Sequence, residues 1–347
     1  MTMRMSTSPP CGVDGRRMGE VHSTDRNTMG KHLAVVLRNP ERIQELFGAN
    51  DGNLSVFEEL LGVRVYFQGN QIYLESCEEA KRTLFERVLN ELEDHVALGQ
   101  LPGPDLIRAV YRTLNAKKDQ NSQLLKETCV VIPGGLKKVF PRSYKQALYL
   151  KAIETKDLVF SVGPAGTGKT YLAVAQALKS VLSRNRRKLI LTRPVVEAGE
   201  NLGFLPGDLE QKISPYLRPL YDAMEAFIPP EALRRLEENR VIEIAPLAYM
   251  RGRTLSECFV ILDEAQNTTK EQMKMFLTRL GEGTQAVVTG DITQIDLTRR
   301  NSSGLLDVIS VLKSIREIDF TFLGEEDVVR NPLVRKIVRA YEAKQEE

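Results

Sequence analysis

The stretch GPAGTGKT, residues 163–170, constrains the fold more than any other part of this 347-residue chain. It fits the pattern G-x-x-x-x-G-K-[ST] in full, follows the apolar run DLVFSV and precedes the helix-like run YLAVAQAL. Glycines in such a turn let backbone N–H groups close around phosphate oxygens, and the N-terminus of a following helix adds a positive field. The sequence therefore predicts a phosphate-binding loop between a strand and a helix.

Two side chains of this loop have predicted roles of their own. Lys169 supplies a positive charge to the terminal phosphates of a nucleotide, and the Thr170 hydroxyl ligates Mg²⁺. The chain has no [NT]KxD motif, which reads guanine, so the predicted cofactors are ATP and Mg²⁺. The residues predicted to bind the nucleotide phosphates are Gly163, Pro164, Ala165, Gly166, Thr167, Gly168, Lys169 and Thr170.

A second apolar run ends in two adjacent carboxylates, Asp263 and Glu264 of FVILDEAQNTT. Paired carboxylates at the end of a hydrophobic strand are costly unless a cation or a reaction uses them. In the presence of a phosphate-binding loop, Asp263 is predicted to hold Mg²⁺ through water and Glu264 to activate the attacking water. A solvated strand end is the alternative, and the complete loop upstream favours the catalytic role.

Two glutamines are further candidates. Gln294 follows the apolar strand of VVTGDITQID, where its amide is predicted to sense the γ-phosphate or hold the attacking water. The alternative there is a polar turn after a core strand. Gln146 lies in PRSYKQALYLKAI, a predicted helix before the first strand, where its side chain is predicted to pair with the edge of adenine. A helix glutamine with no such role is the alternative.

Four segments divide the chain. Residues 1–30 are predicted to be a flexible tail, without the apolar h-region of a secretory signal. Residues 31–114 alternate helix-like and strand-like runs, with a hairpin around Gly69-Asn70, and predict a small α+β domain. Residues 115–140 are the predicted linker, which begins with the polar, aperiodic stretch 115–129. In residues 141–347, short β-branched runs alternate with helices, which predicts a parallel sheet with helices on both faces.

Composition narrows the class of protein. No apolar run approaches the ~20 residues that a membrane span requires. The four cysteines show no CxxC pairing and the three histidines no ligand spacing, which indicates a reducing cytoplasm without disulfides or a zinc site. Charge is unevenly distributed: residues 31–115 carry nine Lys and Arg against thirteen Asp and Glu, whereas residues 158–196 carry seven basic residues and no acid. We therefore expect a cytoplasmic protein without membrane contact.

Several blocks of the sequence point to one family. They are VGPAGTGKTYLAVAQAL, TRPVVEAGENLGFLPGDLEQKISPYLRPLYDAM, LAYMRGRTL, VILDEAQNTT, TGDITQIDL and DVVRNPLVRKIVRAYE. Together they resemble the PhoH family of bacterial ATPases, in the long form with an N-terminal KH-like module. The resemblance extends over residues 135–345 and, more loosely, over 31–113. It implies a P-loop NTPase with a single RecA-like core, and it supports the roles of Gln146, the loop, the acid pair and Gln294. It also implies links to RNA metabolism, including partnership with a metal-dependent endoribonuclease in ribosomal RNA maturation.

The KH-like module departs from a KH domain in two respects. A KH domain clamps an RNA backbone with a GxxG loop, and no GxxG occurs in residues 31–113. The module is also net acidic, which repels phosphate. These departures favour a protein-contact role over direct RNA binding.

Superfamily 1 helicases, whose first core the family resembles, close ATP between two RecA-like cores, and the second core donates an arginine. The sequence after Gly163 holds strands for one sheet, so a neighbouring subunit is the expected donor. We therefore predict a ring, a hexamer, with ATP at the subunit interfaces. Arg330 is the first candidate for the arginine, and it joins Lys169, Glu264 and Gln294 in the predicted catalytic set. Arg251, Arg253 and Arg299 are rivals, and an ordinary surface arginine is the alternative for each.

Single-stranded RNA is a predicted ligand. Thr192 and Arg193 end the strand KLILTR on the nucleotide side, where they are candidates for a nucleic-acid phosphate contact. The stretch 194–256, with two Pro-rich turns and several helical segments, is a candidate protrusion over the ring.

These patterns predict an Mg²⁺-dependent ATPase that couples hydrolysis to RNA or to an RNA-processing partner, with helicase activity left open. The alternative is a nucleotide-gated scaffold, in which ATP occupancy controls partner docking. A small-molecule kinase is a third option, against which the acid pair placed for water activation argues.

Overall fold

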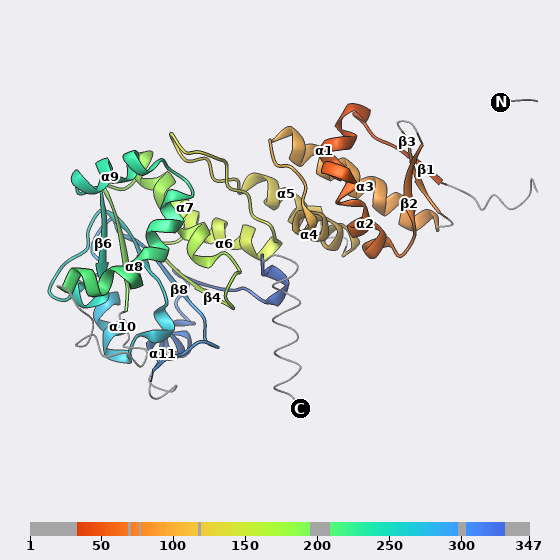
Figure 1. The fold of residues 1–347 in the computed structure, drawn as a ribbon. Helices are drawn as coiled ribbons and strands as arrows, with labels where there is room; N and C mark the ends of the chain where they lie inside the picture. Colours follow the sequence, from red (N-terminus) through yellow and green to blue (C-terminus); the bar gives the residue numbers. More distant parts are fainter. Residues whose placement is uncertain are drawn as a thin grey trace, which may run out of the picture.

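The computed structural model describes residues 33–68, 71–75, 78–116, 119–194, 209–297 and 303–329. Within these residues the chain forms two parts, an N-terminal module drawn in red and orange and a larger α/β domain drawn from yellow-green to blue (Figure 1). Helix α5 (Asp119–Glu127) lies between them (Figure 1). The predicted tail, residues 1–30, and the hairpin turn at Gly69-Asn70 lie outside the described residues.

The N-terminal module is an antiparallel sheet of strand order β1-β3-β2, packed against helices. Its elements are β1 (Leu33–Val36), α1 (Ile43–Phe47), α2 (Leu54–Leu61), β2 (Val65–Gln68), β3 (Gln71–Leu74), α3 (Glu79–Ala97) and α4 (Pro104–Asn115). Leu74 of the central strand lies opposite both Leu33 and Val65. The small α+β domain predicted from sequence is confirmed.

Local sequence explains these elements. Apolar residues three and four positions apart bury one face of α3, through Phe85, Val88, Leu89 and Leu92. Helix α2 ends at Gly62, whose φ of 67° lies in the left-handed region that favours glycine. Together the buried faces of the helices and the sheet form one continuous apolar core in this module.

The segment predicted as a linker, residues 115–140, has structure of its own. Helix α5 buries Leu125, and Lys126 pairs with two carboxylates of α3, Glu91 at 2.9 Å and Asp94 at 3.1 Å. Farther along, a β-bridge joins Val130 and Val139. The sequence of α5, DQNSQLLKE, has only two apolar residues and they are adjacent, so no helical period was visible.

The α/β domain is built on a six-stranded parallel sheet of order β6-β5-β7-β8-β4-β9. The strands are β4 (Leu158–Val162), β5 (Lys188–Arg193), β6 (Ile242–Pro246), β7 (Cys258–Leu262), β8 (Gln285–Gly290) and β9 (Ile318–Phe322). The helices are α6 (Tyr144–Thr155), α7 (Lys169–Leu182), α8 (Leu209–Glu225), α9 (Pro230–Glu238), α10 (Lys270–Leu277) and α11 (Gly304–Leu312).

Helices cover both faces of this sheet, as predicted. Adjacent residues of β4 contribute to different cores: Val159 packs with Leu172 of α7, and Phe160 packs with Phe276 of α10. Because successive side chains of a strand point to opposite faces, the two cores lie on opposite sides of the sheet. Buried strands with two apolar faces are what a parallel sheet requires.

The stretch 194–256 joins the body of the domain. Helix α8 buries Leu220 and Met224 in the core beside α7, and β6 adds an edge strand to the sheet. Sequence patterns predicted turns and helices here, and β6 was missed because Glu243 interrupts its apolar residues and Pro246 ends it. Residues 195–208 lie outside the described part.

Candidate functional site

The phosphate-binding loop connects β4 to α7, as the sequence predicted. Gly168 has a φ of 81° and is the N-cap of the helix. Gly163 lies so close to the neighbouring chain that an added Cβ would be 2.6 Å from the carbonyl oxygen of Leu323. A larger residue would therefore be strained at Gly168, because of its backbone angle, and would not fit at Gly163, because of the Leu323 backbone.

The Lys169 ammonium is folded back onto the loop. Its Nζ donates to the carbonyl oxygens of Gly163 at 2.7 Å and Pro164 at 2.9 Å, and the residue is 9% exposed. These bonds hold a buried cation at the N-terminus of α7, where the helix field already favours an anion. The loop thus presents one lysine charge and backbone N–H groups together.

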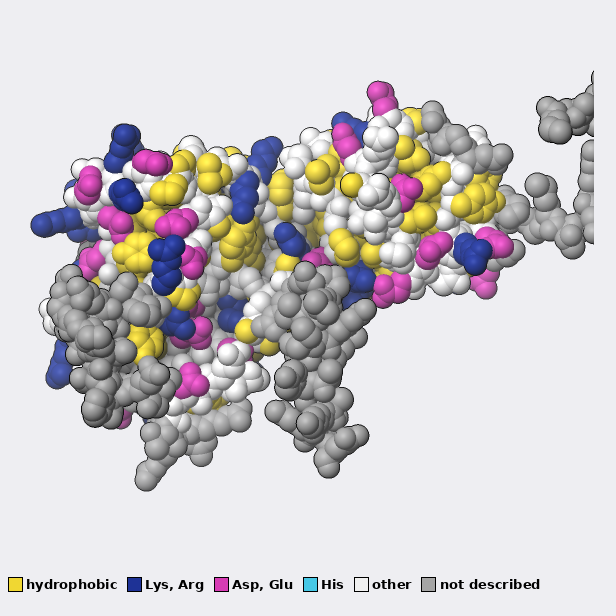
Figure 2. All heavy atoms as spheres, in the orientation of Figure 1, with side chains coloured by type: hydrophobic (Ala, Val, Ile, Leu, Met, Phe, Trp, Pro, Cys, Tyr) yellow, Lys and Arg dark blue, Asp and Glu magenta, His cyan; other side chains and the backbone are white. Residues whose placement is uncertain are grey.

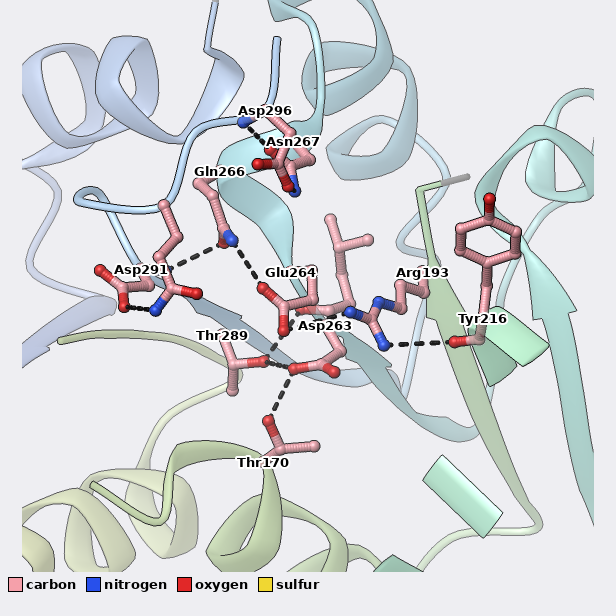
Figure 3. A network of polar contacts seen from close by, with 12 residues as sticks. Thr170, Arg193, Tyr216, Asp263, Glu264, Gln266, Asn267, Thr289, Asp291 and Asp296 are labelled. Carbon is pink, nitrogen blue, oxygen red and sulfur yellow. Dashed lines mark hydrogen bonds and ion pairs between the residues drawn. The ribbon is translucent and has the colours of Figure 1, made fainter. Parts of the chain in front are cut away.

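Asp263 meets the loop from the end of β7, which is separated from β4 by β8 in the sheet. The Thr170 hydroxyl donates to its Oδ1 at 2.6 Å, and the Thr289 hydroxyl donates to the same oxygen at 2.6 Å (Figure 3). Leu262 pairs with Val288 in the parallel register of β7 and β8, so Asp263 and Thr289 emerge side by side at the strand ends. The predicted convergence of Thr170 and Asp263 is therefore present in the structure.

Glu264 has both carboxylate oxygens engaged. Arg193 pairs with Oε1 at 3.2 Å, and the Gln266 amide donates to Oε2 at 2.5 Å (Figure 3). The Gln266 oxygen in turn accepts the backbone N–H of Asp291 at 2.9 Å. The backbone of Glu264 is left-handed, with a φ of 52°, a conformation that L side chains rarely adopt and that clusters at functional sites.

Arg193 comes from the end of β5, next to β7 in the sheet. Besides its pair with Glu264, its Nη1 donates to the backbone oxygen of Tyr216 on α8 at 3.2 Å (Figure 3). The guanidinium thus links the acid pair to the helix that follows β5.

Gln294 lines the same cavity and contacts Asp291, to whose Oδ2 its amide donates at 2.6 Å. The cavity has a volume of about 260 Å³ and is lined by Ala165, Gly166, Gly168, Lys169, Thr170, Tyr171, Asp263, Glu264, Gly290, Asp291 and Gln294. The structure therefore brings the loop, the acid pair and Gln294 to one hollow, where the γ-phosphate contact of Gln294 stays a prediction.

Gln146 lies beneath the loop. Its Oε1 accepts the backbone N–H of Arg142 at 2.7 Å, and its Nε2 donates to the Thr167 oxygen at 3.0 Å. Gln146 is buried, with 3% of its surface exposed. One helical turn on, the Tyr149 hydroxyl donates to the Lys169 oxygen at 3.2 Å, and burial raises the pKa of Tyr149 well above its usual range. Both side chains brace the loop in this structure, and the adenine contact of Gln146 stays a prediction.

The candidate arginines fall into two groups. Arg330 and Arg299 lie outside the described residues. Arg253 forms a two-point ion pair with Glu243 of β6, at 2.5 and 2.9 Å, which lowers the pKa of Glu243. Arg251 is exposed at the end of the 3-10 turn Leu247–Met250. Of the two described arginines, Arg251 is thus the one without an ion pair to a described residue.

The oxygen donors at the loop suit Mg²⁺. This ion prefers hard oxygen ligands and usually keeps several waters, with one or two carboxylates plus substrate phosphates. The Thr170 hydroxyl and the Asp263 carboxylate provide such a set, and their 2.6 Å contact shows that one small cation could reach both. Within the described residues, no group of three or more His, Cys, Asp or Glu side chains is arranged to hold a metal. None of the described helices has the length and hydrophobicity needed to cross a bilayer.

Sequence reasoning missed three residues of this site. In the sequence, Thr289 is only one of the residues at the end of a predicted strand. The register of β7 and β8, which places Thr289 beside Asp263, is the signal that could have identified it. Gln266 is the last letter of DEAQ, yet nothing local shows that it holds Glu264. Tyr149 was hidden among the apolar residues of α6.

A parallel sheet with a glycine-rich phosphate loop after one strand and an acid pair after its near neighbour defines a P-loop NTPase fold. Comparison with known proteins agrees and is more specific. A family model described as "PhoH-like protein" matches residues 138–342, and the chain belongs to the PhoH-like family. The resemblance predicted from the sequence blocks is confirmed.

Curated relatives match most of the chain. A PhoH-like protein from Mycobacterium bovis is 47% identical over 304 residues, which are 87% of this chain and 85% of that protein. A PhoH-like protein from Bacillus subtilis is 44% identical over 318 residues, 90% of this chain and 99% of the relative. Protein PhoH from Escherichia coli is 45% identical over 205 residues, 58% of each chain. The N-terminal module is therefore shared with the first two.

Among solved structures, Pif1 helicase from Candida albicans matches 52% of this chain and 39% of its own, at 15% identity and a TM-score of 0.27. A TM-score this low adds nothing to the fold assignment, which rests on the sheet and the loop.

Proposed function

We propose that this protein is an Mg²⁺-dependent ATPase that couples hydrolysis to RNA or to an RNA-processing partner. One observation carries the proposal: the Thr170 hydroxyl and the Asp263 carboxylate meet at 2.6 Å, in the cavity that Lys169 and Glu264 also line. These residues supply the parts that phosphoryl transfer to water needs, which are a phosphate cradle, metal ligands and a base.

The described residues divide the work as follows. Lys169 would exchange its bonds to the loop carbonyls for the terminal phosphates of ATP. Thr170 and Asp263 would hold Mg²⁺, which, when bound, neutralises charge on the phosphate oxygens. Glu264 would take a proton from the attacking water. Gln294, on the same cavity wall, would position that water or the γ-phosphate.

The state of Glu264 suggests how RNA would be coupled to hydrolysis. A general base needs a free carboxylate oxygen within hydrogen-bond reach of water, and both oxygens of Glu264 are engaged by Arg193 and Gln266. A nucleic-acid phosphate is a strong competitor for an arginine. RNA bound near Arg193 would therefore draw the guanidinium away and release Glu264, which makes hydrolysis dependent on RNA.

Phosphate release tests this proposal. Wild-type protein with ATP and Mg²⁺ is expected to hydrolyse slowly, and single-stranded RNA is expected to raise the rate. Arg193→Ala should raise the rate without RNA and abolish the RNA response, since the restraint on Glu264 is removed. A rate that stays at background with RNA, in protein that binds ATP, would contradict the coupling to RNA.

Assembly is part of the proposal. The charge that develops on the γ-phosphoryl group calls for an arginine, worth about 10³–10⁵ in rate. The described residues hold one parallel sheet, so we propose that a neighbouring subunit donates the arginine, in a cytoplasmic hexameric ring with ATP at the interfaces. Native mass with and without ATP and Mg²⁺ tests this, and a monomer under both conditions would contradict it.

The same engagement of Glu264 favours a second candidate, a nucleotide-gated scaffold in which ATP occupancy controls partner docking. The acidic N-terminal module would then be the docking surface, and an endoribonuclease the partner that the family resemblance implies. A flat hydrolysis response to RNA, with ATP-dependent binding of such a partner, would favour this candidate.

A further inference from the structure

A second cavity lies where the N-terminal module meets the α/β domain. Its volume is about 280 Å³. The module contributes one wall, with Gln100, Leu101, Gly103, Pro104, Asp105 and Leu106. The other wall comes from the chain before α6 and from the first turn of α7, with Lys137, Lys138, Val139, Phe140, Arg142 and Tyr171. On the face drawn in Figure 2, Lys and Arg side chains lie along this junction.

This cavity adjoins the phosphate cavity, because Tyr171 lines both. Tyr171 directly follows Thr170, the last residue of the phosphate loop. Arg142, on the same wall as Tyr171, donates its backbone N–H to Gln146, whose amide reaches the loop at Thr167. The acid pair lines the phosphate cavity and not this one. The nucleoside end of a bound nucleotide would thus leave the phosphate site on the Tyr171 side.

We propose that this second cavity receives the base and ribose of the nucleotide, so that the N-terminal module forms one wall of the nucleotide site. The inference rests on the proposed nucleotide binding and goes further, since it makes the site a composite of two parts of the chain. A bound nucleotide would then contact the N-terminal module directly.

The lining suits a nucleoside. Phe140 and Tyr171 contribute aromatic side chains, although the Tyr171 ring also packs on Phe227, with ring centroids 4.5 Å apart. Leu101 and Pro104 offer aliphatic surface from the opposite wall. Such pockets are lined mainly by apolar and aromatic side chains, with few polar groups that fix orientation. Three basic residues and one acid line the cavity, a balance that favours a ligand joined to phosphates.

A neighbouring hollow fits less well. It shares Asp105 and Arg142 with the second cavity but is also lined by Glu325, Glu326 and Asp327. No aromatic residue lines it, and its four carboxylates outnumber its three arginines, whereas three basic residues outnumber one acid in the second cavity. Of these two cavities, the one lined by Tyr171 is therefore the better candidate for the nucleoside.

The module's wall is held in place by polar contacts. Lys138 donates to the Leu98 oxygen at 3.1 Å, directly across the junction. Within the module, the Asn53 amide donates to the Pro102 oxygen at 3.0 Å and so fixes the loop between α3 and α4. A wall fixed in this way costs little ordering entropy when a base packs against it.

Photolabelling of the full chain with 8-azido-ATP and Mg²⁺ tests the composite site. Trypsin releases residues 88–108, between Arg87 and Arg108, as one peptide that contains the whole module wall. Label in this peptide that excess ATP suppresses is the expected result. Label confined to peptides of the α/β domain would overturn the inference while leaving nucleotide binding intact. Absence of ATP-protected label anywhere would overturn the proposed function with it.

A matched pair of variants gives a second test. Leu101 is 68% exposed on the module wall, and Leu98 is 42% exposed nearby without lining the cavity. Leu101→Trp is expected to weaken ADP binding by about fivefold or more. Inorganic tripolyphosphate, which has no base, should bind this variant like wild type, and Leu98→Trp should bind both probes like wild type. Unchanged ADP affinity in Leu101→Trp, or an equal loss for both probes, would contradict the inference.

Discussion

Both parts of the molecule bury polar side chains, but they use them differently. In the N-terminal module, Asn53 donates to the backbone oxygens of Leu46 and Pro102, each at 3.0 Å, and Glu93 accepts the backbone N–H of Asn39 at 2.9 Å. In the α/β domain, Asp263 is bonded to other side chains, at the edge of a cavity.

The difference separates structural from functional polarity. A buried side chain that bonds the backbone satisfies groups that would otherwise be left unpaired, and it holds a loop. Buried side chains that line a cavity can exchange their bonds for a ligand, whether the partner is another side chain, as for Asp263, or a loop carbonyl, as for Lys169. We therefore expect substitutions in the first group to change stability and substitutions in the second group to change chemistry.

The largest effect is expected for Glu264→Gln, which keeps the side-chain shape and removes the base. Phosphate release should fall by about 10²–10⁴-fold while ATP affinity is retained. Glu257→Gln is the matched control, because Glu257 also has a left-handed backbone, with a φ of 51°, and pairs with an arginine, Arg187, at 2.7 Å. Undiminished release by Glu264→Gln, or an equal loss in the control, would contradict the assignment of the base.

A smaller loss is expected for Thr289→Val, because the Thr289 hydroxyl donates to Asp263, the carboxylate that we propose holds the metal. Removing such a supporting hydrogen bond costs about 10–100-fold in metal affinity or activity. The Mg²⁺ dependence of phosphate release measures it. Thr289→Ser keeps the hydroxyl and should release phosphate at close to the wild-type rate. An equal loss of activity in Thr289→Ser and Thr289→Val would show that the packing of the Thr289 methyl group, and not its hydrogen bond, is responsible.

In the module, Glu93→Ala should change stability alone. It leaves the Asn39 N–H without its buried partner, which costs about 1–3 kcal/mol in the free energy of unfolding. Denaturant titration measures this loss, and phosphate release per folded molecule should be unchanged. A fall in phosphate release with unaltered stability in Glu93→Ala would contradict the claim that buried polar residues of the module affect stability alone.

The smallest effect concerns pH. Burial lowers the pKa of His95 from its ordinary value of 6.5, although a hydrogen bond with Gln100 opposes the shift. As pH falls below 6.5, the unfolded chain therefore binds more protons than the folded chain. The contribution of His95 to the free energy of unfolding is therefore complete above pH 6.5. Below pH 6.5 it falls by at most about 1.4 kcal/mol per pH unit. Thermal unfolding at pH 7 and pH 5 should show a shallower pH dependence in His95→Gln, and parallel curves would refute the role of His95.

Local motifs made the candidate site of the α/β domain predictable. The phosphate loop and the acid pair each have a sequence signature, and Thr170 and Asp263 meet because parallel strands place their carboxyl ends at one edge of the sheet. Gln294 was placed in the same cavity by the same logic.

What could not be predicted depends on contacts distant in sequence. The pairing of Arg193 with Glu264 joins residues on neighbouring strands, and no local pattern encodes it. The second cavity forms only because the loop between α3 and α4 meets the chain before α6. Helix α5 was missed because its two apolar residues are adjacent and show no helical period, and β6 was missed because Glu243 interrupts its apolar residues.

Electron paramagnetic resonance of Mn²⁺ in place of Mg²⁺ tests the central claim, that Lys169, Thr170 and the acid pair converge on one metal-bound triphosphate. With a non-hydrolysable ATP analogue, Mn²⁺ should bind tightly and show coupling to phosphorus nuclei, and Asp263→Asn should weaken the binding. Tight Mn²⁺ binding without the nucleotide, or binding that Asp263→Asn leaves unchanged, would contradict the account.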